Sequence, residues 1–140
     1  MDNAQYRKEV EEAIAAADNA LYYLQKADES LKSAGNWGIW DMIGGGFIST
    51  MVKHSKMDEA ERNIEMARNA IQNFSKEMKD IGHVTDTYID VGSFLRFADY
   101  FFDGLIADWM VQSKIDQARE QVFQAVDQIN DIKRQLKQML

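Results

Sequence analysis

The sequence contains no cysteine and no proline, and only two of its 140 residues are histidine. Without cysteine the chain can form no disulfide, thiolate nucleophile or zinc–thiolate site, and a reducing cytoplasm is the expected location. Because proline breaks the helical hydrogen-bond ladder, its absence favours long uninterrupted helices. A di-metal helical bundle needs Glu-x-x-His on two helices, and this motif precedes neither His54 nor His83. We therefore expect no metal and no cofactor.

Positive charge is scarcer than negative charge, since 16 Lys and Arg residues stand against 23 Asp and Glu residues, for a net charge of −7. An acidic chain repels the phosphate backbone, and no basic patch stands out, so nucleic-acid binding is not expected. No apolar run reaches the roughly 20 residues that are needed to span a membrane. The chain is 46% hydrophobic and 28% charged. This balance and the length predict a single domain over residues 1–140.

Apolar residues recur at steps of three and four in three segments, which is the pattern of amphipathic helices. The first segment predicts a helix from about Asn3 to Lys32. Gly35 follows it and suits the left-handed residue that often comes after a helix end. The fold class expected from these segments is all-α.

The second and third segments each carry an unbroken a/d seam of about four heptads, which is typical of coiled coils. The two seams consist of Met57, Ala60, Ile64, Ala67, Ile71, Phe74, Met78 and Ile81, and of Ile115, Ala118, Val122, Ala125, Ile129, Ile132, Leu136 and Met139. Ser55 with Asp58, and Ser113 with Asp116, resemble capping boxes. We therefore expect these two helices to begin next to the two serines.

An internal repeat becomes visible when the chain is shifted by 58 residues. Ten identities occur over the 41 pairs that begin at Asp41, where chance gives roughly two or three. Asp41 aligns with Asp99, and Gly46 aligns with Gly104. The repeat predicts a duplication with halves 1–81 and 82–140.

The duplication has a topological consequence. Two helical hairpins would form an up-down-up-down four-helix bundle, in which His83–Asp103 climbs back along the second helix. Met57–Ile81 and Ile115–Met139 would then run side by side in the same direction. The alternative is three long helices with an aromatic cap, in which His83–Asp103 does not cross the bundle.

Most of the 15 aromatic residues lie in two stretches, Ala34–His54 and His83–Gln112. In an up-down-up-down bundle the aromatic residues of these stretches would gather at one end, as a core plug or as a binding site. The candidate binding residues are Trp37, Trp40, Phe47, Phe97, Phe101, Trp109, Asp41 and Asp99.

The segment WGIWDMIGGGFISTMVKHSKMDEA contains Trp-Asp, Gly-Gly-Gly, Lys-His-Ser and Asp-x-Ala. It resembles a group of uncharacterised bacterial all-helical coiled-coil proteins with the same succession of motifs. The resemblance covers about Gly35 to Ala60. It implies an all-α bacterial protein and brings no activity with it.

No motif for catalysis is present. The serines lack a nucleophile elbow, and Gly44–Gly46 lacks the spacing and the lysine of a phosphate loop. We therefore expect a non-enzymatic helical interaction or scaffold protein whose partner is another protein or a second copy. Acids such as Asp103 and Asp108 disfavour contact with a membrane surface. The alternative is a small-ligand or metal-binding bundle with a carboxylate-lined pocket near Asp41 and Asp99.

Overall fold

The computed structural model describes residues 3–44, 47–84, 94, 96–99 and 115–140, with side chains over 4–33, 58–81, 94, 96–99 and 118–140. Three long helices make up most of this part of the chain: α1 (Asn3–Gly44), α2 (Phe47–Val84) and α4 (Ile115–Gln138). Residues 94 and 96–99 are also helical. The described part of the chain holds no strand, so the expected all-α helical bundle is confirmed.

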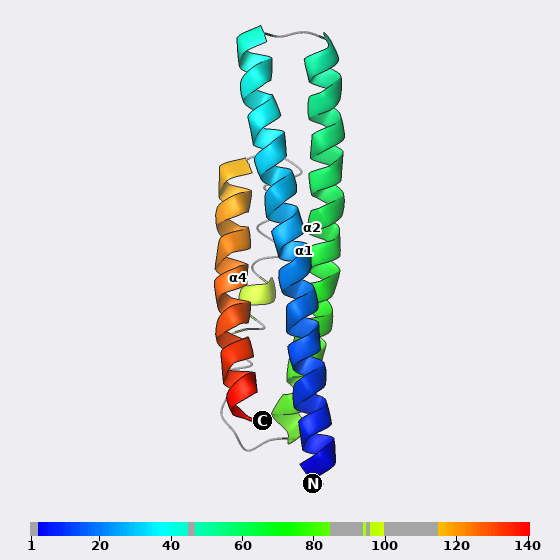
Figure 1. Ribbon diagram of the computed structural model, residues 1–140, viewed down its shortest axis with the longest axis vertical. Coiled ribbons are helices and arrows are strands. Elements are labelled where there is room, and N and C mark those ends of the chain that lie inside the picture. Colours follow the sequence, from blue (N-terminus) through cyan, green and yellow to red (C-terminus); the bar gives the residue numbers. More distant parts are fainter. Residues whose placement is uncertain (1–2, 45–46, 85–93, 95, 100–114) are drawn as a thin grey trace.

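The helices lie along one common axis (Figure 1). α1 runs antiparallel to α2, and α4 runs in the same direction as α2 (Figure 1). α1 packs against both of the others, whereas the described backbones of α2 and α4 do not approach one another closely. The repeat predicted the shared direction of α2 and α4. It wrongly predicted that they would be adjacent. Most of His83–Asp103 lies outside the described residues.

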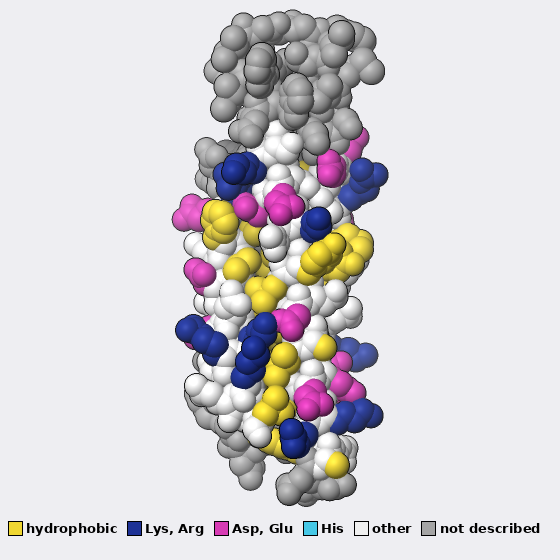
Figure 2. Space-filling model, viewed as in Figure 1, with side chains coloured by type: hydrophobic (Ala, Val, Ile, Leu, Met, Phe, Trp, Pro, Cys, Tyr) yellow, Lys and Arg dark blue, Asp and Glu magenta, His cyan; other side chains and the backbone are white. Residues whose placement is uncertain are grey.

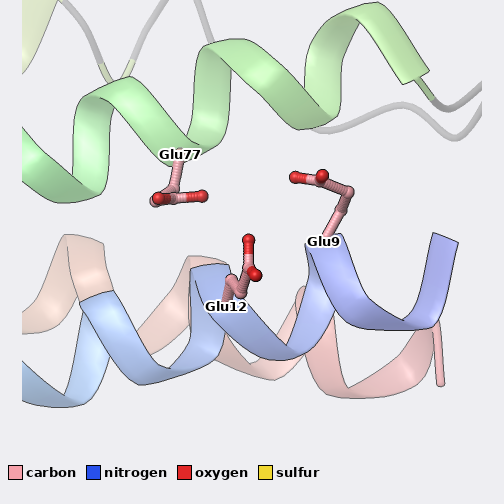
Figure 3. Close-up of side chains that lie close together, drawn as sticks. All are labelled: Glu9, Glu12 and Glu77. Carbon is pink, nitrogen blue, oxygen red and sulfur yellow. The ribbon is translucent and has the colours of Figure 1, made fainter. Parts of the chain in front are cut away.

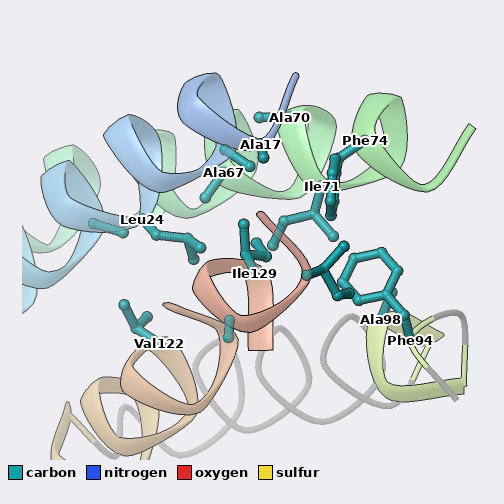
Figure 4. Close-up of a cluster of buried hydrophobic side chains, with 14 of the residues drawn as sticks. Ala17, Leu24, Ala67, Ala70, Ile71, Phe74, Phe94, Ala98, Val122 and Ile129 are labelled. Atoms are coloured by element: carbon teal, nitrogen blue, oxygen red, sulfur yellow. The ribbon is translucent and has the colours of Figure 1, made fainter. Parts of the chain in front are cut away.

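The core is formed where the apolar stripes of the helices meet. Every predicted seam residue of α2 and α4 whose side chain is described is buried, except Met139, which is partly buried. α1 contributes Val10, Leu24 and Leu31, all fully buried, together with several alanines. Figure 4 shows Leu24 of α1, Ile71 of α2 and Ile129 of α4 converging on this core. The spacing of three and four residues therefore identifies the buried face of each helix correctly.

Two predicted helix boundaries are wrong. α1 continues through Gly35 to Gly44, and α2 already begins at Phe47, so Ser55 lies inside a helix and does not cap it. A helical glycine costs only about 1 kcal/mol relative to alanine, and a cap contributes about the same. Neither is enough to end a helix whose neighbouring turns are also helical. In the described part of the chain α4 begins at Ile115; Ser113 lies outside the described residues, so the cap expected there stays a prediction.

The hairpin of α1 and α2 extends beyond the first residue of α4 (Figure 1). Beyond that point the described part of the bundle consists of two helices. Among the helices that the structure describes, none combines enough length and apolar character to cross a lipid bilayer.

Candidate functional site

The structure distributes the predicted aromatic site over distant parts of the bundle. Trp37, Trp40 and Asp41 lie in the last turns of α1, and Phe47 begins α2. The side chains of these four residues lie outside the described ones. Phe101 and Trp109 fall outside the described residues altogether.

Phe97 and Asp99 belong to a short helical piece that lies much further down the bundle. Its position is given by Phe94, whose ring packs edge-on against Phe74 with 5.1 Å between centroids (Figure 4). Phe74 lies 27 residues after Phe47 in α2, a rise of about 40 Å. Phe97 is partly buried against the core, and Asp99 is exposed. Phe94 and Phe97 therefore do not lie at the predicted aromatic end, and the gathering of the other aromatics stays a prediction.

Three carboxylates that the sequence did not single out lie together where α1 and α2 pack. Glu9 and Glu12 of α1 and Glu77 of α2 point toward one another, and each offers an oxygen within 4.8 Å of the others (Figure 3). Lys8 forms an exposed ion pair with Glu12, with 3.9 Å between Nζ and Oε1. Glu77 lies 65 residues after Glu12 and 68 after Glu9, so no local motif reveals this cluster.

The cluster changes the titration of one member. Burial raises the pKa of Glu77 above its ordinary value of 4.5, and the nearby carboxylates of Glu12, Asp80 and Glu9 raise it further, while Lys76 opposes the shift. Glu12 is exposed, and the other two glutamates are partly buried. Exposed acidic groups of this kind are common on helical proteins, so the cluster alone defines no site.

A more distinctive surface lies between α1 and α4. Here a groove of about 370 Å³ follows the line where the two helices meet. It is lined by Leu21, Leu24, Gln25 and Asp28 of α1, and by Val122, Phe123, Val126 and Asn130 of α4. Figure 2 shows a stripe of hydrophobic side chains along this line, with charged side chains on both sides. We call this surface the α1–α4 groove.

Ion pairs between the two helices flank the groove. At one end the Arg119 guanidinium donates to Asp28, with 2.9 Å between Nε and Oδ1. Toward the other end Lys133 pairs with Asp18. Both pairs are partly exposed, so their direct contribution to stability is small, on the order of 1 kcal/mol or less. Their position holds α1 and α4 in a defined register on either side of the apolar floor.

Phe123 projects from α4 at the edge of the groove. Half of its surface (50%) is exposed, although it is one of the larger apolar residues of the chain. The Arg119 guanidinium lies 5.6 Å from the centre of its ring, in a cation–π contact. An exposed ring beside an apolar groove keeps hydrophobic surface in contact with water.

Sequence reasoning missed the groove because its residues belong to two helices about 100 residues apart. Leu21 lies on the apolar stripe of the first predicted helix and is only partly buried. Phe123 follows the seam residue Val122 directly, so it points away from the core. A large aromatic residue just outside an otherwise regular seam is the local signal that could have indicated this surface.

Comparison with known proteins identifies no family for this chain. No family model, no curated protein and no solved structure matches it. The functional argument therefore depends on the geometry of the described residues.

Proposed function

We propose that the protein is a non-enzymatic helical interaction module, and that the α1–α4 groove is the surface through which it binds a protein. The observation that carries this proposal is the half-exposed ring of Phe123 beside a groove with an apolar floor. Grooves of this kind between two helices accept the apolar face of a third helix. The polar residues Gln25, Asp28 and Asn130 at the groove would orient such a partner.

The proposal includes an up-down-up-down four-helix bundle made of two hairpins. It is supported by the direction of α4, which matches that of α2 (Figure 1). Residues 94 and 96–99, which lie between α2 and α4 in the chain, are helical, as a further helix there requires. The alternative with a carboxylate-lined pocket receives no support from the placement of Asp99, which lies far from the end of α1 that holds Asp41.

A photo-crosslinking experiment tests the proposed surface. A benzoylphenylalanine placed at Phe123 should form covalent adducts with a protein partner in living cells of the source organism. The same group at Met66 is the matched control, because Met66 is a similarly exposed apolar residue (44%) on α2, outside the groove. Adducts at position 123 and none at 66 are expected. The absence of adducts at position 123, or equal yields at both positions, would refute the proposal.

A further inference from the structure

We infer that the occupant of the α1–α4 groove is the same surface of a second copy of this chain, with the two α4 helices antiparallel. The inference rests on the proposed function, because it names the partner of that surface. It places a two-fold axis near Val126 and Asp127, so that each copy gives and receives the same contacts.

The first support is that this surface carries both a projecting side chain and a groove of the kind that accepts one. A two-fold contact requires a surface to be complementary to itself. Phe123 projects with half of its surface exposed, and the groove beside it is lined by Leu21, Val126 and Asn130. With the axis near Val126, Phe123 of one copy lies opposite Asn130 of the other. The ring then enters the partner's groove, and the partner's ring enters the first.

The second support is the distribution of charge along α4. After Asp131 the helix carries Lys133, Arg134 and Lys137 and no further acid. The outward-facing acids Glu120 and Asp127 come earlier in the helix, and both are exposed. Antiparallel pairing places the cationic end against the part that contains Glu120. Parallel pairing would place the three cations of one copy against those of the other, and like charges held opposite one another repel.

The spacing of the exposed residues also suits a second helix. Glu120, Phe123, Asp127, Asn130 and Arg134 follow steps of three and four, so they form one stripe on the exposed side of α4. Around an axis at Val126–Asp127, Glu120 of one copy lies opposite the Lys133–Arg134 pair of the other. The contact thus places the two Asp127 residues at the axis, one Phe123 ring on either side of it, and opposite charges toward both ends.

Sedimentation equilibrium of the full chain measures the association. We expect a concentration-dependent dimer, and we expect Phe123→Asp to weaken it by roughly tenfold or more, because it removes the central anchor. Met66→Asp is the control and should leave the dimer unchanged. Helix content by circular dichroism should be the same in all three proteins. A dimer that Phe123→Asp does not weaken uses another surface and overturns the inference.

Cysteine cross-linking then reports the orientation of the two copies. Because the sequence contains no cysteine, only the introduced cysteines can react. Asp127→Cys should cross-link to itself, because it lies next to the axis. Glu120→Cys should not, since its two copies would lie about 20 Å apart along the helices. A mixture of Glu120→Cys and Arg134→Cys should cross-link in antiparallel pairing. Self-cross-linking of both Glu120→Cys and Arg134→Cys indicates a parallel pair and overturns the inference.

The two proposals fail in different ways. If the chain stays monomeric and the photo-crosslinker at Phe123 captures a different protein, the second copy is excluded and the interaction function stands. If position 123 captures nothing in cells, the interaction function fails. An adduct with twice the mass of the chain supports both.

Discussion

The two sides of α1 make different contacts, and the difference lies in the hollow that each contact leaves at the surface. Toward α2, α1 meets a seam that is rich in fully buried alanines, among them Ala60, Ala67 and Ala70 of α2. Small residues let two helices approach closely, and the hollow between α1 and α2 at Ser30 and Asn63 measures only about 230 Å³. Toward α4, the partly buried Leu21 and Val126 leave the groove between the helices. The same heptad spacing therefore produces a contact with a smaller, polar hollow toward α2 and one with a larger, mainly apolar groove toward α4.

The strongest test of this comparison uses one residue type on each side. Phe74→Ala should lower the free energy of unfolding by about 3–5 kcal/mol, because the ring is fully buried and packs on Phe94. Phe123→Ala should change it by less than about 0.5 kcal/mol, since half of that ring is already in water. Urea denaturation at low protein concentration, where association is minimal, measures both. Equal losses would mean that the α4 side is as closed as the α2 side.

Overpacking a buried alanine tests the α1–α2 contact alone. Ala67→Leu should destabilise the protein by about 1–3 kcal/mol, because the buried alanine lies where α1 and α2 approach each other and leaves no room for three more carbons. Gln72→Leu introduces the same residue at an exposed position of the same helix and should be close to neutral. If Ala67→Leu is also neutral in thermal unfolding, the α1–α2 seam is looser than its alanines indicate.

These expectations show which parts of the structure could be predicted from the sequence. The seam of α2 from Ala60 to Ile81 was predicted residue by residue, because burial on one helix face imposes a strict period on the sequence. The boundaries at Gly35 and Ser55 were not predictable from local residues. Each boundary depends on a free-energy difference of about 1 kcal/mol. The cooperative extension of the neighbouring helical turns outweighs this difference.

The candidate site could not be predicted for a different reason. The α1–α4 groove is defined by how closely two helices approach, and heptad spacing specifies which residues face inward but not the distance between the axes. Leu21 looks like an ordinary core residue in the sequence, and Val126 directly follows the seam residue Ala125. Phe94 lies away from the predicted aromatic end because it packs on Phe74, and no local pattern reveals that pairing.

A partly buried hydrogen bond between α1 and α2 gives a further test of that contact. The Asn63 amide donates to the Ser30 hydroxyl across the α1–α2 interface, with 2.5 Å between Nδ2 and Oγ. Asn63→Ala should cost about 1 kcal/mol, the usual net contribution of such a bond. Asn73→Ala, an exposed asparagine in the same helix, is the control. A double-mutant cycle with Ser30→Ala should give a coupling of similar size, and zero coupling would show that the two residues act independently.

The smallest expected effect concerns the acidic cluster at the α1–α2 contact. Because the folded-state pKa of Glu77 is raised, its contribution to stability is fully present below its ordinary value of 4.5 and is lost as the pH rises through the raised value. Glu77→Gln should therefore match the wild type at low pH and exceed it near neutral pH by about 0.5 kcal/mol or less, after screening by solvent. Glu61→Gln, an exposed glutamate of α2 outside the cluster, should show no such pH-dependent gain. A gain that does not vary with pH would contradict the assignment.

The ion pair between Asp28 and Arg119 also has a consequence for the order of folding. It joins residues 91 positions apart, whereas the contact between Ser30 and Asn63 spans 33. Closing the longer loop costs more chain entropy, so we expect the α1–α2 hairpin to form first and α4 to dock last. Hydrogen exchange should then show the amides of α4 opening at lower free energy than those of α1 and α2. Because α4 forms one wall of the groove, the binding surface would be completed in the final step of folding and lost in the first step of unfolding.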